Sequence, residues 1–263
     1  MDLQLAGKCA IISGGSSPIG RAAAIALAQE GVRVALAART PDLLEAAVAE
    51  VRGASGGHVV GLQCDVTDDV SVERMVAEAA QTLGSVDILV NCASPRVRSG
   101  GGGLEAAFPK PEDVIAEMNV KVFGALRCAR AVVPYMRAQG WGRIVNLSGT
   151  NGRTSGASGG SMRNASVVAL TKNLADELGS LGINVTAVNP GVVRTEKTPD
   201  RAQRMGMTVE AFEASVGAES AIGRMVTAEE VAWVIAFLCS PRSVSISGDQ
   251  VTVSGGWGKT IFY

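Results

Sequence analysis

The stretch Ser13-Gly14-Gly15-Ser16-Ser17-Pro18-Ile19-Gly20 lies between a short apolar run and an alanine-rich segment. The apolar run, residues 9–12, predicts a buried strand, and residues 21–30 predict a helix, so the glycines mark a tight turn from strand to helix. Glycines at such a turn let the backbone approach a pyrophosphate, whose charge then lies against N–H groups at the positive end of the helix. The sequence therefore predicts a dinucleotide-binding turn at the start of an α/β fold.

The same strand and helix pattern recurs along the rest of the chain. Further strands are predicted at 32–37, 58–63, 86–90, 142–147, 182–188 and 250–253, and further helices at 41–52, 68–83, 112–139, 162–179 and 227–239. Strands that alternate with helices favour right-handed crossovers, and so one doubly wound, Rossmann-type parallel sheet with helices on both faces. We expect a single domain over residues 1–263, with a lid segment at residues 194–224 beside the carboxyl edge of the sheet.

Composition and charge argue against several classes of protein. The chain has 263 residues, of which 47% are hydrophobic, and its 24 Lys+Arg nearly balance its 25 Asp+Glu. This balance leaves no basic surplus for nucleic acid, and neither a signal peptide nor a membrane-spanning run is evident, so we expect a cytoplasmic protein with no membrane partner. The five cysteines are scattered, which favours buried thiols over disulfides or a zinc site, and we expect no metal.

The order of elements, and the residues at their ends, resemble the short-chain dehydrogenase/reductase (SDR) family over nearly the whole length. Besides the glycine-rich turn, the matching features are Cys64-Asp65-Val66, Asn91-Cys92-Ala93-Ser94, Asn119, Ser148 and Asn189-Pro190-Gly191-Val192-Val193-Arg194-Thr195. The resemblance implies an NAD(P)-dependent alcohol or ketone oxidoreductase in which Ser148 and Asn119 belong to the catalytic site.

The resemblance also implies which residues contact the cofactor, NADP or NAD. These are Gly14, Ser16, Pro18, Ile19, Gly20, Arg39, Asp65, Val66, Asn91, Ala93, Pro190, Gly191 and Thr195. Arg39 follows the second predicted strand, where a guanidinium would bind the 2′-phosphate of NADP. Pro18 replaces the second glycine of the turn, and there it removes an N–H donor and adds a ring, although proline is also a good first residue of a helix. Cofactor binding is therefore open at this point.

The family's proton-transfer residues are absent from their positions. Active members carry a tyrosine and, four residues later, a lysine, whose ammonium lowers the pKa of the phenol. The stretch Ala165–Lys172 fixes the register and places Gly160 at the tyrosine position and Asn164 at the lysine position. Tyrosine occurs only at Tyr135 and Tyr263, and no lysine lies between Lys121 and Lys172. We therefore expect neither a phenol nor an ammonium beside Ser148.

Three functional interpretations follow. The first is a catalytically degenerate subunit that supports an active SDR paralogue in a dimer or tetramer, homomeric or heteromeric, as in the benzylsuccinyl-pathway acyl-CoA dehydrogenase; its substrate would be a small molecule or an acyl-CoA. The alternative is an atypical SDR enzyme, an NADP(H) oxidoreductase, lyase or hydrolase, that uses Ser148 and Asn119 with loop residues such as Ser158, Ser161 or Arg163. A ligand-sensing module is a third reading. The only histidine, His58, is expected at the surface and not as a base for Ser148.

Overall fold

A computed structural model describes residues 1–95 and 104–259, with only the backbone of residues 104 and 105. Its main sheet has seven parallel strands in the order β3-β2-β1-β4-β5-β6-β9. The strands are β1 (Cys9–Ser13), β2 (Arg33–Ala38), β3 (Val59–Gln63), β4 (Ile88–Asn91), β5 (Gly142–Leu147), β6 (Ile183–Pro190) and β9 (Gln250–Val253). The predicted doubly wound sheet is confirmed. Its strand order reverses between β1 and β4, the place where ligands bind in open sheets of this kind.

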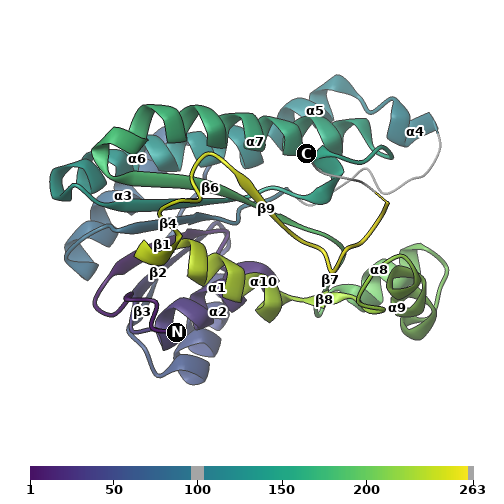
Figure 1. Cartoon of the computed structure of the whole chain (residues 1–263), viewed down its shortest axis with the longest axis horizontal. Helices are drawn as coiled ribbons and strands as arrows, with labels where there is room; N and C mark the ends of the chain where they lie inside the picture. The colour runs from purple at the N-terminus through teal and green to yellow at the C-terminus, as the bar shows by residue number, and fades with distance from the viewer. Residues whose placement is uncertain (96–103, 260–263) are drawn as a thin grey trace.

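Helices cover both faces of the sheet (Figure 1). One layer consists of α1 (Pro18–Gln29), α2 (Pro41–Ser55) and α10 (Ala228–Leu238), and the other of α3 (Asp69–Leu83), α6 (Gly124–Gln139) and α7 (Ser158–Leu178). Successive strand side chains point to opposite faces, so Ile12 packs in the first layer and Ile11 in the second. Both are fully buried, which explains why the central strands read as continuous apolar runs.

The long helix predicted at 112–139 is divided in the structure. It consists of α5 (Pro111–Met118), a π-helical turn η1 (Asn119–Phe123) and α6. Hydrophobic periodicity does not reveal a single π-helical turn, because the turn changes the helical phase by only one residue. The first residue of α7 is Ser158, four residues before the predicted start. The prediction treated the glycines at 159 and 160 as loop, whereas both lie buried in the first turn of this helix.

The segment predicted as a lid forms a separate small layer at one end of the molecule (Figure 1). It contains α8 (Thr198–Arg204) and α9 (Val209–Ala218), and it is flanked by the paired strands β7 (Val193–Arg194) and β8 (Val226–Thr227). Phe212 and Met225 are buried in a small core of its own. The shorter elements are α4 (Leu104–Ala107), η2 (Thr150–Gly152), η3 (Gly179–Leu181) and η4 (Pro241–Ser243). Within residues 1–95 and 104–259, no helix has the length and apolar character needed to cross a bilayer.

Candidate functional site

The glycine-rich turn brings the ends of β1 and β4 into close contact. Gly14 has φ +67°, and a Cβ there would lie 2.6 Å from the Cα of Ala93. A Cβ on Gly20 would lie 2.5 Å from the carbonyl oxygen of Gly14. Pro18 is the first residue of α1, where a missing N–H breaks no helical hydrogen bond, and the Ser17 hydroxyl accepts from the Gly20 N–H at 3.2 Å. The backbone of this turn therefore has a conformation and a close packing that only glycine permits at residues 14 and 20.

The other residues expected to contact the cofactor follow the ends of neighbouring strands. Arg39 comes directly after β2, Asp65 and Val66 follow β3, and Pro190 ends β6. Burial raises the pKa of Asp65, but hydrogen bonds from the Thr67 N–H and hydroxyl, with the positive charges of Arg39 and Arg127, outweigh it and lower this pKa overall. These residues line the carboxyl edge of one sheet, and their contact with a nucleotide remains a prediction.

A row of buried polar side chains runs beneath this edge. The Ser13 hydroxyl donates to Asn91 Oδ1 at 3.1 Å, and Asn91 Nδ2 donates to Asn146 Oδ1 at 2.9 Å. Asn146 Nδ2 donates in turn to Thr171 Oγ1 at 3.0 Å. The row joins β1, β4, β5 and α7, so the strand ends that frame the site are fixed to one another. The amide of Asn91, expected at the cofactor, belongs to this row.

The structure brings Ser148 into contact with Asn164 and places Gly160 on the same helix as Asn164. Ser148 is buried, and its hydroxyl donates to the carbonyl oxygen of Asn164 at 2.9 Å. Asn119 begins the π-helical turn η1, and its carbonyl oxygen accepts from Arg127 at 3.4 Å. Gly160 is buried one helical turn before Asn164, and a Cβ there would have its nearest neighbour, the Asn151 amide, at 3.5 Å.

No phenol lies beside Ser148 among the residues that the structure describes. Tyr135 is on α6 with 38% of its surface exposed, as expected of a residue outside the site. Tyr263 lies outside the described residues. His58 is exposed just before β3, which agrees with its expected surface position. In the described ranges no group of three or more histidine, cysteine or acidic residues is arranged to hold a metal.

The expectation that no ammonium lies beside residue 148 is wrong. Lys121, on η1, donates from Nζ to the carbonyl oxygen of Ser148 at 2.9 Å and to Asn164 Oδ1 at 2.8 Å. Its side chain is buried, and this burial, helped by the positive charge of Arg163, lowers its pKa to about 7. Sequence reasoning looked for the lysine along the helix of Asn164 and missed one that arrives from another element. The signal was its position two residues after Asn119.

A buried ion pair lies next to Lys121. The guanidinium of Arg163, on α7, donates to the carboxylate of Glu117, on α5. Arg163 Nη2 would lie 3.9 Å from a Cβ on Gly160, so the pair borders the position where the family has its phenol. The hydroxyls of Ser158 and Ser161 donate to the carbonyls of Ala107 and Thr154. The three residues considered for an alternative chemistry were expected in a loop, but all of them lie on α7, and Arg163 is the one whose charge acts on Lys121.

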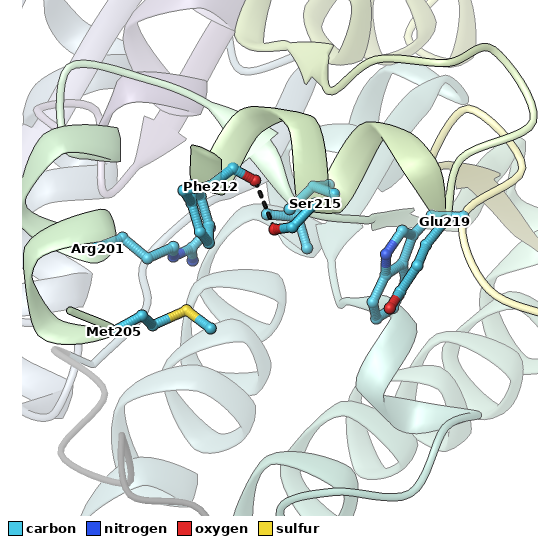
Figure 2. A pocket seen from close by; sticks show the side chains of 8 residues that line it. Arg201, Met205, Phe212, Ser215 and Glu219 are labelled. Carbon is cyan, nitrogen blue, oxygen red and sulfur yellow. Dashed lines mark hydrogen bonds between the residues drawn. The ribbon is translucent and has the colours of Figure 1, made fainter. Parts of the chain in front are cut away.

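A pocket lies against the lid segment. The sequence predicted no binding role for any residue of its walls. Its volume is about 280 Å³, and its walls are Val192, Arg201, Met205, Phe212, Ser215, Val216, Glu219 and Trp257. Figure 2 shows Arg201 on α8 and Met205, the residue directly after this helix, facing Phe212. Ser215 Oγ donates to the Phe212 carbonyl at 2.7 Å. The walls are mostly apolar, with one guanidinium and one carboxylate, as in many small-molecule pockets.

Comparison with known proteins gives a consistent result. The family model described as enoyl-(acyl carrier protein) reductase matches residues 14–258. The short-chain reductase protein NovJ of Streptomyces niveus is 35% identical over 94% of this chain and 92% of the relative. The 3-oxoacyl-[acyl-carrier-protein] reductase FabG of Thermotoga maritima is 33% identical over 97% of this chain and 99% of the relative.

Solved structures agree over the same length. The crystal structure of L-sorbose reductase from Gluconobacter frateurii, complexed with NADPH and L-sorbose, superposes with a TM-score of 0.90 at 30% identity, covering 99% of this chain and 100% of that chain. A 7α-hydroxysteroid dehydrogenase complexed with NADH gives a TM-score of 0.85 at 28% identity, covering 98% and 97%. The sheet order, the glycine-rich turn and these full-length matches together show that the chain belongs to the short-chain dehydrogenase/reductase family.

Proposed function

We propose that the chain is a non-catalytic subunit of an NAD(P)-dependent alcohol or ketone oxidoreductase, assembled with an SDR paralogue that retains the tyrosine and lysine. The observation that carries the proposal is Gly160, which gives the phenol position no side chain at all. Reduction of a carbonyl requires a proton at the new hydroxyl, and a positioned acid accelerates such a step by about 10²–10⁴. The Ser148 hydroxyl does not supply this proton readily, because it is buried and donates to the backbone of Asn164.

The glycine-rich turn supports retained cofactor binding. Gly14 keeps the positive φ and the close packing against Ala93 that fix the turn, and Pro18 occupies a helix position where its ring is tolerated. Gly14, Ile19 and Gly20 would hold the pyrophosphate, and Arg39 favours the 2′-phosphate of NADP(H). When bound, the nicotinamide supplies hydride chemistry. The protein would use the cofactor to order the carboxyl edge of its own sheet, with a small-molecule or acyl-CoA substrate held in the partner's site.

Two measurements test the proposal. NADPH titrated into the purified chain, followed by the emission of the reduced nicotinamide, should show binding, and the same sample should show no turnover with ketones or acyl-CoA ketones. Coexpression with a paralogue from the same genome that retains Tyr-x-x-x-Lys should give a heteromer with an even number of subunits in sedimentation analysis. Turnover by the isolated chain, or two separately sedimenting species, would overturn it.

One observation favours a second candidate, an atypical SDR enzyme. The buried amine of Lys121 lies within hydrogen-bonding distance of Ser148 and Asn164, and its pKa is lowered to about 7. Such an amine has the proton affinity of a general acid or base at neutral pH. If the isolated chain turns over a ketone, Lys121→Met should abolish that activity. Lys172→Met should not, because Lys172 is exposed and pairs with Asp176.

A further inference from the structure

We propose that Lys121 supplies the positioning ammonium of this site. In the family this role belongs to a lysine of the helix that corresponds to α7, whereas here the lysine comes from the π-helical turn η1. The chain would then lack only the phenol. The inference rests on the proposed function, because it concerns a site that has lost one catalytic group. It differs from the sequence-based expectation that both groups of the pair are gone.

The ammonium lies within the reach that a lysine side chain at residue 164 would have. Gly160 and Asn164 are one turn apart on α7, and both are buried, so their side-chain directions share a face. Lys121 Nζ donates to Asn164 Oδ1 at 2.8 Å. An asparagine side chain plus one hydrogen bond spans about the length of an extended lysine side chain. The amide of Asn164 therefore acts as an acceptor that holds the borrowed ammonium at this distance from the helix.

A second contact ties the ammonium to the serine residue. Lys121 Nζ donates to the carbonyl oxygen of Ser148 at 2.9 Å, and the hydroxyl of the same residue donates to the Asn164 backbone at 2.9 Å. Lys121, Ser148 and Asn164 thus form a closed set of three hydrogen bonds from three elements. Gly160 lies one helical turn before Asn164 on α7, so a long side chain at residue 160 would extend along the helix face that carries Asn164.

A purely structural lysine does not account for this arrangement well. Lysine is almost never buried without an ionic partner, because removing an ammonium from water costs several kcal/mol. Among the described residues, no carboxylate forms a salt bridge with Lys121, since Glu117 pairs with Arg163 instead. Both acceptors of Lys121 are neutral amide oxygens. An amine buried at this cost, next to the residue that matches the family's catalytic serine, is typical of a functional group.

Several groups face Lys121 and must be separated in any test. Cys92 lies after β4, Glu117 on α5 and Arg163 on α7, and each affects the pKa of Lys121. Arg163 is the main competitor, because its guanidinium would also lie 3.9 Å from a Cβ on Gly160. Its charge is balanced by Glu117, whereas the charge of Lys121 is not. The ammonium should therefore have the larger effect on a phenol placed at residue 160.

The test restores the phenol and measures its ionisation. In Gly160→Tyr, tyrosinate absorbance in the near ultraviolet is followed against pH, with the wild-type chain subtracted to remove the contribution of Tyr135 and Tyr263. We expect part of the introduced phenol to ionise below its ordinary pKa of about 10, in the pH range where Lys121 is still charged, because the charged ammonium favours the phenolate. The phenolate in turn favours the charged ammonium, so the two groups titrate as a pair. This measurement requires neither cofactor nor substrate.

Three further variants in the same background identify the cation. Lys121→Met should return the pKa of the phenol to its ordinary value or above. Lys172→Met, which removes an exposed lysine of α7, should leave it unchanged. The double variant Arg163→Met with Glu117→Gln, which removes both charges of the ion pair, should keep most of the decrease in the pKa of the phenol. The proposal is overturned if the phenol ionises normally in Gly160→Tyr, or if its pKa responds to the Arg163 pair and not to Lys121.

A smaller substitution covers the case in which the tyrosine variant does not fold. Gly160→Cys adds only a Cβ and a thiol, and the nearest neighbour of that Cβ is 3.5 Å away, an ordinary contact. Its thiol pKa is read from the pH dependence of alkylation, because the five native cysteines are all buried. We expect a lower pKa with Lys121 than with Lys121→Met, and equal values overturn the proposal. Either result leaves the heteromer test unaffected, so failure here and failure of the proposed function are distinguishable.

Discussion

Lys121 changes how the stability of the folded chain depends on pH. Burial lowers its pKa from 10.5 to about 7, so between these values the unfolded chain binds a proton that the folded chain does not. Stability should therefore rise with pH across this window, and the full penalty of burying the charge applies below pH 7. In Lys121→Met this rise should be absent. The difference in unfolding free energy between wild type and variant should change by about 2 kcal/mol from pH 7 to pH 9, measured by urea unfolding.

The matched control for this experiment is Lys172→Met, which removes an exposed lysine. Its unfolding free energy should run parallel to that of the wild type over the same pH range. If the Lys121 variant also runs parallel to the wild type, then the amine is not held neutral by burial.

Gly14 and Gly53 separate two roles of glycine. Gly14 has φ +67°, and a Cβ there would lie 2.6 Å from the backbone of Ala93, so Gly14→Ala should destabilise the fold by more than about 1 kcal/mol and weaken NADPH binding. Gly53 lies within α2 with no atom within 4 Å of a Cβ. There, Gly53→Ala should stabilise by roughly 0.5–1 kcal/mol. Urea unfolding measures both, and equal effects would contradict the account of the glycine-rich turn.

At the scale of one element, α10 shows how a helix start is fixed. The Thr227 hydroxyl accepts from the Glu230 N–H at 3.3 Å, and the Glu230 carboxylate accepts from the Thr227 N–H at 2.9 Å. A hydrogen bond from Arg224, then the one from Thr227, lowers the pKa of Glu230 to about 2. Glu230→Gln should cost about 1 kcal/mol at pH 7, measured by thermal unfolding.

The cost should depend on pH with a definite sign. A carboxylate with a lowered pKa contributes stability above its ordinary value of 4.5, and this contribution is lost as the pH falls toward 2. The gap between wild type and Glu230→Gln should therefore narrow below pH 4.5. Glu229→Gln, at the neighbouring position in the same first turn, should show neither the cost nor the narrowing.

The elements also show where sequence reasoning succeeds. The strands were predicted to within about two residues because their continuous apolar runs follow from burial on both faces. The π-helical turn η1 was not predicted, and Lys121 lies on it. Its partner Asn164 is 43 residues away in sequence, and no local pattern joins them. The sequence predicts which residues lie at the ends of individual strands and helices. It does not predict which side chains of different helices contact each other, because those contacts depend on how the helices pack.

For the whole molecule, the buried polar row connects the sheet to the helix that carries the site. Asn146 is its central member, since it accepts from Asn91 and donates to Thr171. Asn146→Ala would leave the Asn91 amide buried without its acceptor, which should lower the unfolding free energy by at least about 2 kcal/mol. Asn173→Ala, on the exposed face of α7, is the control and should cost much less. Equal urea midpoints for the two variants would show that the row contributes little.

The lid segment leaves and rejoins the sheet through two adjacent strands, with Val193 opposite Val226 and Arg194 opposite Thr227. The two ends of the lid segment therefore lie next to each other where they join the rest of the domain. A foreign segment from a relative would have to fit this pair of junctions, the Arg21 contact to Glu196, and the hydrogen bonds from Ser220 and Ile222 to the carbonyl of Gly255. Grafting residues 195–225 as one segment, together with the residues of the C-terminal stretch that contact it, is thus the natural route to chimeras that ask whether this segment sets ligand preference.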